Sequence, residues 1–305
     1  MDSVFWLDLI ASSLRLATPL IFCALAGVLS ERAGVIDIGL EGKMLFAAFA
    51  AAAVGVTTQS LAWSMLAAIA VAVALSCLHG FACINYGGDQ VISGLAINII
   101  AAGVTVVLGI AWFSQGGQTP QVPDSVRLKA ITSIPLLAHN ILVYVALLLV
   151  IGVWWLLFKT RFGLRLRAVG ENPAMVDAAG VSVAKTRYLA LIGNGALCGL
   201  AGCYLVLAQN AAFAPQMTAG RGFMALAAMI FGKWHPVGAL WACLLFGFLD
   251  AVSIRLQGTK LPGLGEVPVQ LVQALPYLLT VILLAGFIGK ATAPKALGSP
   301  YVKTR

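Results

Sequence analysis

Five long stretches of this sequence contain no Asp, Glu, Lys or Arg. They run from Met44 to Gly88, Gln90 to Pro123, Ala130 to Phe158, Tyr188 to Gly220 and Val267 to Gly289. Each is a continuous apolar run rich in Ala, Leu and Gly, which is typical of membrane-spanning helices and differs from the alternating strands of a barrel. A helix needs about 20 residues to cross the bilayer core. The first stretch is too long for one helix and is expected to turn near Val56–Ser60.

The apolar runs predict an all-α, polytopic transmembrane helical bundle of about 8–10 spans. We place nine spans at about 9–29, 36–56, 61–83, 90–113, 139–158, 187–208, 211–232, 237–257 and 270–289. The seventh contains APQMTAGRG, a poor continuous helix, so at least one broken or re-entrant helix is expected. Such a break is tolerated where the backbone faces protein or a water-filled cavity. Residues 1–305 are expected to form a single transmembrane domain.

Composition agrees with a membrane protein and argues against a soluble one. Of 305 residues, 61% are hydrophobic and 10% are charged, whereas soluble domains carry about 25% charged residues. The net charge of +8 is better explained by basic cytoplasmic loops than by nucleic acid, and no nucleic-acid partner is expected. The first residues, MDSVFWLDL, lack a basic leader region, so the first apolar segment is expected to remain as a membrane anchor among lipids.

Basic residues predict how the spans are oriented. The loop at 159–187 holds six Lys and Arg residues, and the tail after Gly289 holds four more. Both segments are therefore expected on the cytoplasmic side. Four predicted spans separate them, an even number that is consistent with this placement. Five spans precede the loop, so the N-terminus and the 114–140 loop are expected outside.

Cysteine and histidine give no sign of a metal or a catalytic centre. All six cysteines lie in or beside apolar segments without a CxxC pair, and the three histidines are scattered. No metal site and no cofactor are expected. The predicted spans also lack a paired His, Asp and Glu constellation, which argues against a membrane enzyme.

Charge gathers in ERAGVIDIGLEG, between two apolar runs. Glu31 and Arg32 are expected at the cytoplasmic end of the first span. Glu41 falls at the start of the second helix, where the helix dipole favours a carboxylate. One expectation is a structural role, in which Glu41 caps a helix or pairs with Arg32, Lys43 or another basic residue. The alternative is a direct role in substrate contact or gating.

A few other polar residues inside the spans are candidates for a translocation path. Together with Glu41, we consider Asn98, Asn194 and Phe223, because intramembrane polar groups usually face the bundle interior. The alternative for the two amides is interhelical hydrogen bonding. Arg221, between Gly220 and Gly222, is a candidate for the outer entrance or a plain interfacial anchor.

Two segments of the chain are alike. GLEGKMLFAAFAAA from Gly39 and AGRGFMALAAMIFG from Ala219 share a glycine pair followed by an aromatic, Met and Ala-rich helix. They are predicted to run in opposite directions. This would fit an inverted repeat of the kind found in transporters, although helices rich in small residues also look alike by chance.

The cytoplasmic loop contains a short predicted helix. Asn172 is a good helix cap, Pro173 suits the first turn, and Gly180 is a plausible stop. A two-turn helix between basic flanks suits docking to a cytoplasmic partner, and an ordinary amphipathic loop helix is the alternative.

The sequence resembles a known family in several separated motifs. ERAGVIDIGLEGKMLFAAFAAA is similar to a signature of inner-membrane permeases of ABC importers of the branched-chain amino acid and ribose type, most of all their nucleoside and simple-sugar branch. The resemblance continues through QVISGLAINIIAAGV, TRFGLRLRAVGENPAMVDAAGVSV, TAGRGFMALAAMIFGKWHPVGAL and APKALGSPY. It covers nearly the whole chain.

The resemblance implies a multi-pass permease subunit of a bacterial cytoplasmic membrane that moves nucleosides by alternating access. Simple sugars or branched-chain amino acids are the alternative cargo. It also implies a second homologous permease, a cytoplasmic ABC ATPase and an extracytoplasmic substrate-binding protein as partners. The 159–187 loop would be the coupling loop, and its residues matching the ATPase-docking helix are Asn172, Pro173, Ala174, Asp177, Ala178 and Gly180.

ATP hydrolysis is expected in a partner. The stretch most similar to a GxxxxGK[ST] phosphate loop is AGFIGKAT. The first glycine of the motif would fall just before this stretch, at Leu284, and the position directly after Lys290 is Ala instead of Ser or Thr. A stand-alone secondary transporter remains a different class of function, and it would move substrate down an ion gradient without an ATPase.

Overall fold

The computed structural model describes residues 2–131, 138–256 and 292–302, with residues 260–261, 265–266, 274 and 278 between them. The helices are α1 (Asp2–Arg32), α2 (Leu40–Thr58), α3 (Leu61–Gly80), α4 (Gln90–Phe113), α5 (Ile141–Lys159), α6 (Arg161–Glu171), α7 (Pro173–Ala178), α8 (Val183–Cys203), α9 (Arg221–Phe231) and α10 (Pro236–Leu256). Wide π-helical turns, η1 (Phe81–Asn85) and η2 (Tyr204–Asn210), extend α3 and α8. Two short strands, β1 (Lys260–Leu261) and β2 (Gly265–Glu266), pair in antiparallel fashion.

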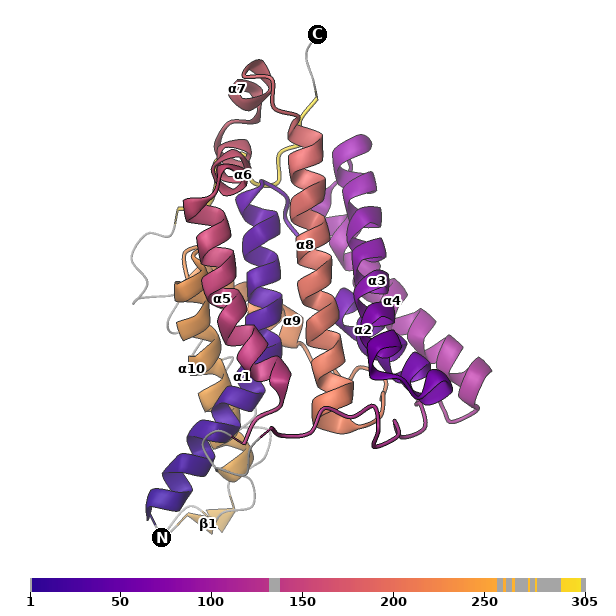
Figure 1. Ribbon diagram of the computed structural model, residues 1–305. Helices are drawn as coiled ribbons and strands as arrows, with labels where there is room; N and C mark the ends of the chain where they lie inside the picture. The colour runs from indigo at the N-terminus through magenta and orange to yellow at the C-terminus, as the bar shows by residue number, and fades with distance from the viewer. Residues whose placement is uncertain are drawn as a thin grey trace.

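Seven helices of the described part are long and apolar enough to cross a membrane: α1, α2, α3, α4, α5, α8 and α10. Figure 1 shows α1 and α8 in the middle of the bundle, with α2, α3 and α4 on one side and α5 and α10 on the other. The apolar parts of α1, α2 and α8 are largely buried, whereas only 22% of the apolar window is buried in each of α3 and α4. The predicted helical transmembrane fold is therefore confirmed. The ninth predicted span, 270–289, lies outside the described residues apart from 274 and 278.

The predicted orientation agrees with the arrangement of the two basic segments. The loop that contains α6 and α7, which we call the α6–α7 loop, and the tail at 292–302 lie at the same end of the bundle. The start of α1 lies at the other end (Figure 1). We call these the cytoplasmic and outer ends. The loop at 114–131 crosses the outer end, where backbone N–H groups of Val122 and Leu128 donate to the carbonyls of Ala211 and Leu207 at 2.7 and 2.8 Å. These hydrogen bonds hold the loop against the outer end of the bundle.

Two predicted spans begin differently from expectation. The second, placed at 36–56, becomes helical only at Leu40, because residues 33–39 form a non-helical segment that we call the first break. The seventh, placed at 211–232, is not one helix. Residues 211–220 are a non-helical segment, the second break, and α9 supplies only 11 residues. The broken helix expected here is confirmed, and glycine and proline in APQMTAGRG explain why no continuous helix forms.

Close packing of α8 holds the centre together. On α8, Gly195 and Gly199 are one turn apart and face α3, where a Cβ would lie 2.6 Å from the Cα atoms of Val73 and Ile69. Without side chains at these two positions, the backbones of α8 and α3 touch directly. Small residues serve this purpose in membranes, where helices associate through packing rather than water exclusion. Similarly, α10 lies along α1.

Candidate functional site

The starts of α2 and α9 meet inside the bundle. Glu41, in the first turn of α2, accepts hydrogen bonds from the backbone N–H groups of Gly220 at 2.8 Å and Gly222 at 2.5 Å. The first N–H groups of a helix have no partner within it and carry partial positive charge. One carboxylate thus satisfies the start of a helix on the other side of the bundle. Gly222 permits this approach, since a Cβ there would lie 2.5 Å from the backbone nitrogen of Glu41.

From this meeting point the two helices run in opposite directions. α2 runs to the outer end, where Gly55 contacts Val122 and Val126 of the outer loop. α9 runs to the cytoplasmic end, where the indole of Trp234 donates to Glu31 at 2.6 Å. The two similar sequence segments therefore form two helices that run in opposite directions, α2 with 19 residues and α9 with 11, each preceded by a break. This is the arrangement that the inverted-repeat interpretation predicts.

Asn98 ties α4 to the start of α2. Its Oδ1 accepts a hydrogen bond from the N–H of Gly42 at 2.8 Å, and its Nδ2 donates to the carbonyl of Ile38 at 3.0 Å. Both polar ends of this amide are therefore engaged by the backbone. Asn98 fixes the position of α2 and at the same time forms part of a cavity wall.

A cavity of about 320 Å³ lies beside the contact between Glu41 and the second break. It is bounded by α2, α4 and the second break, and its lining residues are Glu41, Gly42, Leu45, Asn98, Ala102, Gln216, Thr218, Ala219 and Gly220. The wall combines one carboxylate, two amides and a hydroxyl with apolar side chains. Small-molecule sites likewise combine apolar surface with a small number of polar groups that fix the orientation of the ligand. We refer to this space as the central cavity.

Buried charge next to the cavity supports the first break. Lys43 and Asp37, both without exposed surface, form an ion pair across the start of α2. The Lys43 ammonium also donates to Oδ1 of Asn194 at 3.2 Å, and Asp37 accepts from the N–H of Gly39 at 3.1 Å. Charges in the low-dielectric interior are tolerated when they are paired and hydrogen-bonded. This network holds the break and α2 against α8.

Asn194 belongs to that network rather than to the wall of the central cavity. Its Oδ1 accepts from Ser76 at 3.1 Å as well as from Lys43, and its Nδ2 donates to the carbonyl of Ala26 at 3.0 Å. Its exposed fraction is 0%. In the observed arrangement this amide therefore connects four helices, which is the alternative that the sequence left open.

Phe223 and Arg221 lie on α9 but outside the central cavity. Phe223 is 45% exposed on the surface of the chain. Arg221 donates to Gln209 of η2 at 3.3 Å and interacts electrostatically with Asp250 of α10. Its side chain thus reaches from the middle of the bundle toward the outer end of α8. The roles expected for both residues remain predictions.

The partners expected for Glu41 were partly wrong. Lys43 pairs with Asp37, and Arg32 donates through Nε to the carbonyl of Trp234 at 2.9 Å. Glu41 is held by backbone N–H groups instead. Sequence reasoning also missed the Asp37–Lys43 pair. Two opposite charges six positions apart in an apolar region could have revealed it, because isolated charges are too costly there.

The predicted loop helix is present as α7 and forms the tip of the cytoplasmic end (Figure 1). Asn172 caps it by accepting from the N–H of Met175 at 3.1 Å, and Pro173 occupies the first turn. Gly180, with φ +80°, follows its end. Val176 is buried against Val169 and Val183, which anchors α7 to α6 and α8. The remaining surface of α7, including Ala174, Met175 and Ala178, is exposed.

Comparison with known proteins agrees with this geometry. Residues 9–284 match the family described as branched-chain amino acid transport system, permease component. The chain belongs to this family. It is therefore a multi-pass transport component rather than an enzyme.

Two relatives align over almost their whole length. A guanosine ABC transporter permease of Bacillus subtilis (strain 168) is 40% identical, with 99% of both chains covered. A nucleoside ABC transporter permease of Lactococcus lactis subsp. cremoris (strain MG1363) is 37% identical, with 97% of both chains covered. A solved structure described as an inward-facing conformation of an ABC transporter shares the fold. Its TM-score is 0.52 at 17% identity, with 92% of this chain and 85% of the other covered.

Proposed function

We propose that this chain is the permease subunit of an ATP-driven importer that carries nucleosides across a bacterial cytoplasmic membrane. The observation that carries the proposal is the 40% and 37% identity, over nearly full length, to permeases named for guanosine and nucleoside transport. Simple sugars and branched-chain amino acids are the alternative cargo.

The central cavity is compatible with such a cargo. A nucleoside offers a polar sugar and a flat base, and it carries no fixed charge for which the site must supply a counter-charge. The described wall contains amides, a hydroxyl and a carboxylate whose oxygens are already engaged by α9. Glu41 and Asn98 border the cavity, so we assign both to the translocation path. Asn194 and Phe223 would reach a substrate only in another conformation.

Alternating access requires a contact that can open and close, and the Glu41 contact suits that role. Two backbone N–H groups at the start of α9 donate to this one carboxylate of α2, at a point where Gly222 lets the two backbones approach closely. Separation of α2 from α9 would break these two hydrogen bonds and the close contact at Gly222. We assign Glu41 to this gate.

The chain would work with partners, as expected of one component of a transport system. The exposed α7 would dock on a cytoplasmic ABC ATPase, a second related permease would complete the path, and an extracytoplasmic binding protein would deliver the nucleoside. The residues proposed for ATPase coupling are Asn172, Pro173, Ala174, Asp177, Ala178 and Gly180. Asn172, Pro173 and Gly180 shape α7, whereas Ala174 and Ala178 present its exposed surface.

Uptake by the reassembled importer tests the substrate. The chain would be reconstituted in liposomes with its partner permease, ATPase and binding protein, and entry of radiolabelled guanosine would be measured. We expect uptake with ATP, none with ADP, and competition by other nucleosides but not by ribose or leucine.

Two outcomes would contradict the proposal. Competition by ribose or leucine with no effect of nucleosides would establish one of the alternative cargoes. Uptake by the purified chain alone, driven by an ion gradient, would identify a secondary transporter.

A further inference from the structure

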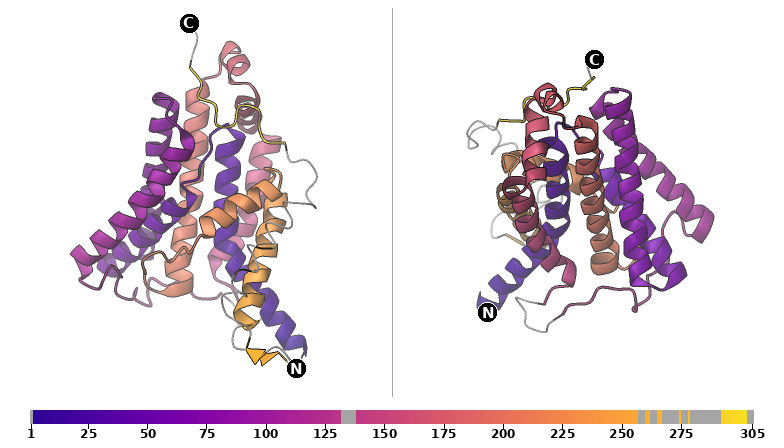
Figure 2. Two further views of the ribbon diagram at one scale, coloured as in Figure 1. Left: turned by 180° about the vertical axis from the view of Figure 1, so that it is seen from behind. Right: turned by 45° about the horizontal axis from the view of Figure 1, so that its top comes forward.

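The tail at 292–302 crosses the cytoplasmic end of the bundle and touches four separate elements. The left view of Figure 2 shows this yellow segment passing over the ends of α1 and α8. It has no regular helix or strand of its own. Two turn hydrogen bonds lie within the tail, from Leu297 to Pro294 and from Ser299 to Ala296. Its other hydrogen bonds show which parts of the chain it connects.

The first contacts join the tail to α6 and to the first break. The N–H of Ala296 donates to the carbonyl of Gly170 at 2.8 Å, and the N–H of Gly298 donates to the carbonyl of Gly34 at 3.2 Å. There is no room for side chains between these segments. A Cβ on Gly170 would lie 2.2 Å from the carbonyl oxygen of Arg32. Backbone thus touches backbone where the tail, α6 and the first break meet.

Arg187 of α8 joins the break to the tail a second time. Its Nε donates to the carbonyl of Ala33 at 3.2 Å, and its Nη2 donates to the carbonyl of Ser299 at 3.3 Å. Only 1% of this residue is exposed. A guanidinium presents its donors in a rigid fork, so it fixes the two carbonyls relative to each other, as a flexible ammonium would not.

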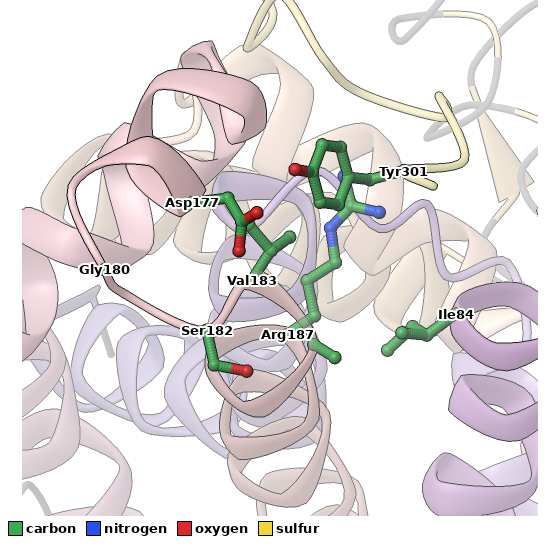
Figure 3. A pocket seen from close by; sticks show the side chains of 8 residues that line it. Ile84, Asp177, Gly180, Ser182, Val183, Arg187 and Tyr301 are labelled. Carbon is green, nitrogen blue, oxygen red and sulfur yellow. The ribbon is translucent and has the colours of Figure 1, made fainter. Parts of the chain in front are cut away.

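Tyr301 then connects the tail to α7. In Figure 3 its hydroxyl points toward the Asp177 carboxylate, with which it forms a hydrogen bond, beside a cavity of about 280 Å³. Its ring packs against the cluster of Val169, Val176 and Val183 that anchors α7. Burial, followed by the hydrogen bond and the charge of Asp177, raises the pKa of Tyr301, so the hydroxyl stays protonated and donates at neutral pH.

We propose that residues 295–301 act as a strap, with Arg187 and Tyr301 as its positioning residues, that makes α7 and the first break move as one body. Movement of α7 on the ATPase would then be transmitted through Gly34 to the start of α2 and to Glu41. The inference rests on the proposed docking role of α7. It adds a connection that neither the coupling loop nor the central cavity contains.

Two shortened chains test the strap in the complete importer. One ends after Pro294 and lacks the strap, and its matched control ends after Val302 and lacks only the last three residues. We expect the first to bind the ATPase and support ATP hydrolysis, while nucleoside uptake per ATP falls by about two- to thirtyfold, the range seen for changes along a coupled network. The control is expected to behave as the full chain does.

Hydrogen exchange supplies a readout that does not depend on the substrate. When a non-hydrolysable ATP analogue is added to the intact complex, exchange is expected to change in α7 and at 33–39 together. In the complex lacking the strap, the change at α7 should persist and the change at 33–39 should disappear.

Point variants cover the possibility that the shortened chain does not fold. Gly298→Ala would strain a backbone at φ +75° and place a Cβ 2.8 Å from Ile36, whereas its control Gly116→Ala strains a backbone at φ +63° with open space around it. Arg187→Lys keeps the charge and loses the fork. We expect reduced uptake per ATP from Gly298→Ala and Arg187→Lys, and none of this effect from Gly116→Ala.

Three results have distinct meanings. Equal uptake per ATP and equal exchange with and without the strap would overturn the inference. Loss of ATPase binding by the shortened chain would also overturn it, because the tail would then be part of the docking surface. If the full-length complex carries no nucleoside, the proposed substrate is wrong, and the exchange measurement still decides for or against the strap.

Discussion

At the scale of single residues, the polar groups buried near the start of α2 form hydrogen bonds or ion pairs with one another and with nearby backbone groups. Glu41 accepts hydrogen bonds from N–H groups at the start of α9, which have no partner within that helix. Asn98 likewise accepts from the N–H of Gly42 at the start of α2. Lys43 and Asp37 neutralise each other. Each of these groups would be costly alone in an apolar surrounding. Their combination keeps two interrupted helices stable within the bundle.

Replacing Glu41 with Gln tests the contact between α2 and α9. The amide offers one acceptor oxygen in place of two and loses the charge that favours a helix start. A charge-assisted hydrogen bond contributes about 1.5–3 kcal/mol, so we expect Glu41→Gln to destabilise the purified chain by about that amount and to reduce uptake. Thermal denaturation in detergent and uptake in liposomes measure the two effects.

The control for this substitution is Asp124→Asn, which removes a carboxylate that is 76% exposed in the outer loop. It should change the stability by less than about 0.5 kcal/mol. If Glu41→Gln changes neither the thermal stability nor the uptake, the carboxylate contact contributes neither to the fold nor to the gate.

At the scale of elements, the interrupted helices and α7 do different work. α9, with 11 residues, is about 16 Å long and cannot cross a bilayer core of about 30 Å by itself. The second break precedes α9, so the start of this helix lies inside the bundle against Glu41. α7 lies outside the bundle and exposes Ala174, Met175 and Ala178.

Ala178→Glu tests α7 as the docking element. Ala178 is exposed at the end of α7, so a bulky charged side chain should block docking while the buried Val176 still anchors the helix. Interface residues that dominate binding contribute about 2 kcal/mol or more, roughly a thirtyfold change in affinity. We therefore expect weaker ATPase binding and loss of uptake with normal membrane insertion. Co-purification of the ATPase measures the binding.

Ala293→Glu makes the same substitution at another exposed position of the cytoplasmic end, outside the strap, and serves as the control. ATPase binding and uptake should be retained in this variant. Full uptake by a correctly assembled Ala178→Glu complex would place the docking surface elsewhere.

At the scale of the whole molecule, the distribution of charge predicts the orientation of the bundle. Basic residues of the α6–α7 loop and the tail gather at one end, and the outer loop crosses the other (Figure 1). Lys and Arg in short loops are retained on the cytoplasmic side. The strap and α7 would then face the ATPase, and the outer end of the bundle, near the start of α1, would face the binding protein.

Labelling of single cysteines checks this orientation. Arg165→Cys should react with a membrane-impermeant maleimide only in inside-out vesicles, and Asp124→Cys only in right-side-out vesicles. The background should be low because five of the six native cysteines are buried. Labelling of Arg165→Cys from the outside would reverse the topology and with it the proposed coupling.

The sequence predicted the helices well where the pattern is local. The span at 90–113 coincides with α4, and the turn near Val56–Ser60 is where α2 ends, at Thr58. Asn172, Pro173 and Gly180 predicted α7 because caps and turn residues act within a few positions. The second span was placed too early, since residues 33–39 are apolar enough to resemble a helix although their backbone is not helical.

The site was predicted less well because its contacts join distant parts of the chain. Glu41 and Asn98 were recognised as polar residues in apolar surroundings, but their partners are backbone groups of Gly220, Gly222 and Gly42. No pattern marks a backbone group as a partner. Asn194 was a candidate for the path for the same reason, and its position in the folded chain assigns its amide to a network with Lys43 and Ser76.

By itself, the sequence determined that this chain is a helical membrane protein, which of its ends is basic, and which transport family it resembles. Apolar length, charge asymmetry and motifs are properties of consecutive residues, so no folded structure is needed to recognise them. Only the tertiary structure decided that α2 and α9 meet start to start, that Lys43 pairs with Asp37, and that the tail reaches Gly34 and α7. These contacts depend on which backbones approach closely, and that is settled when the whole bundle packs.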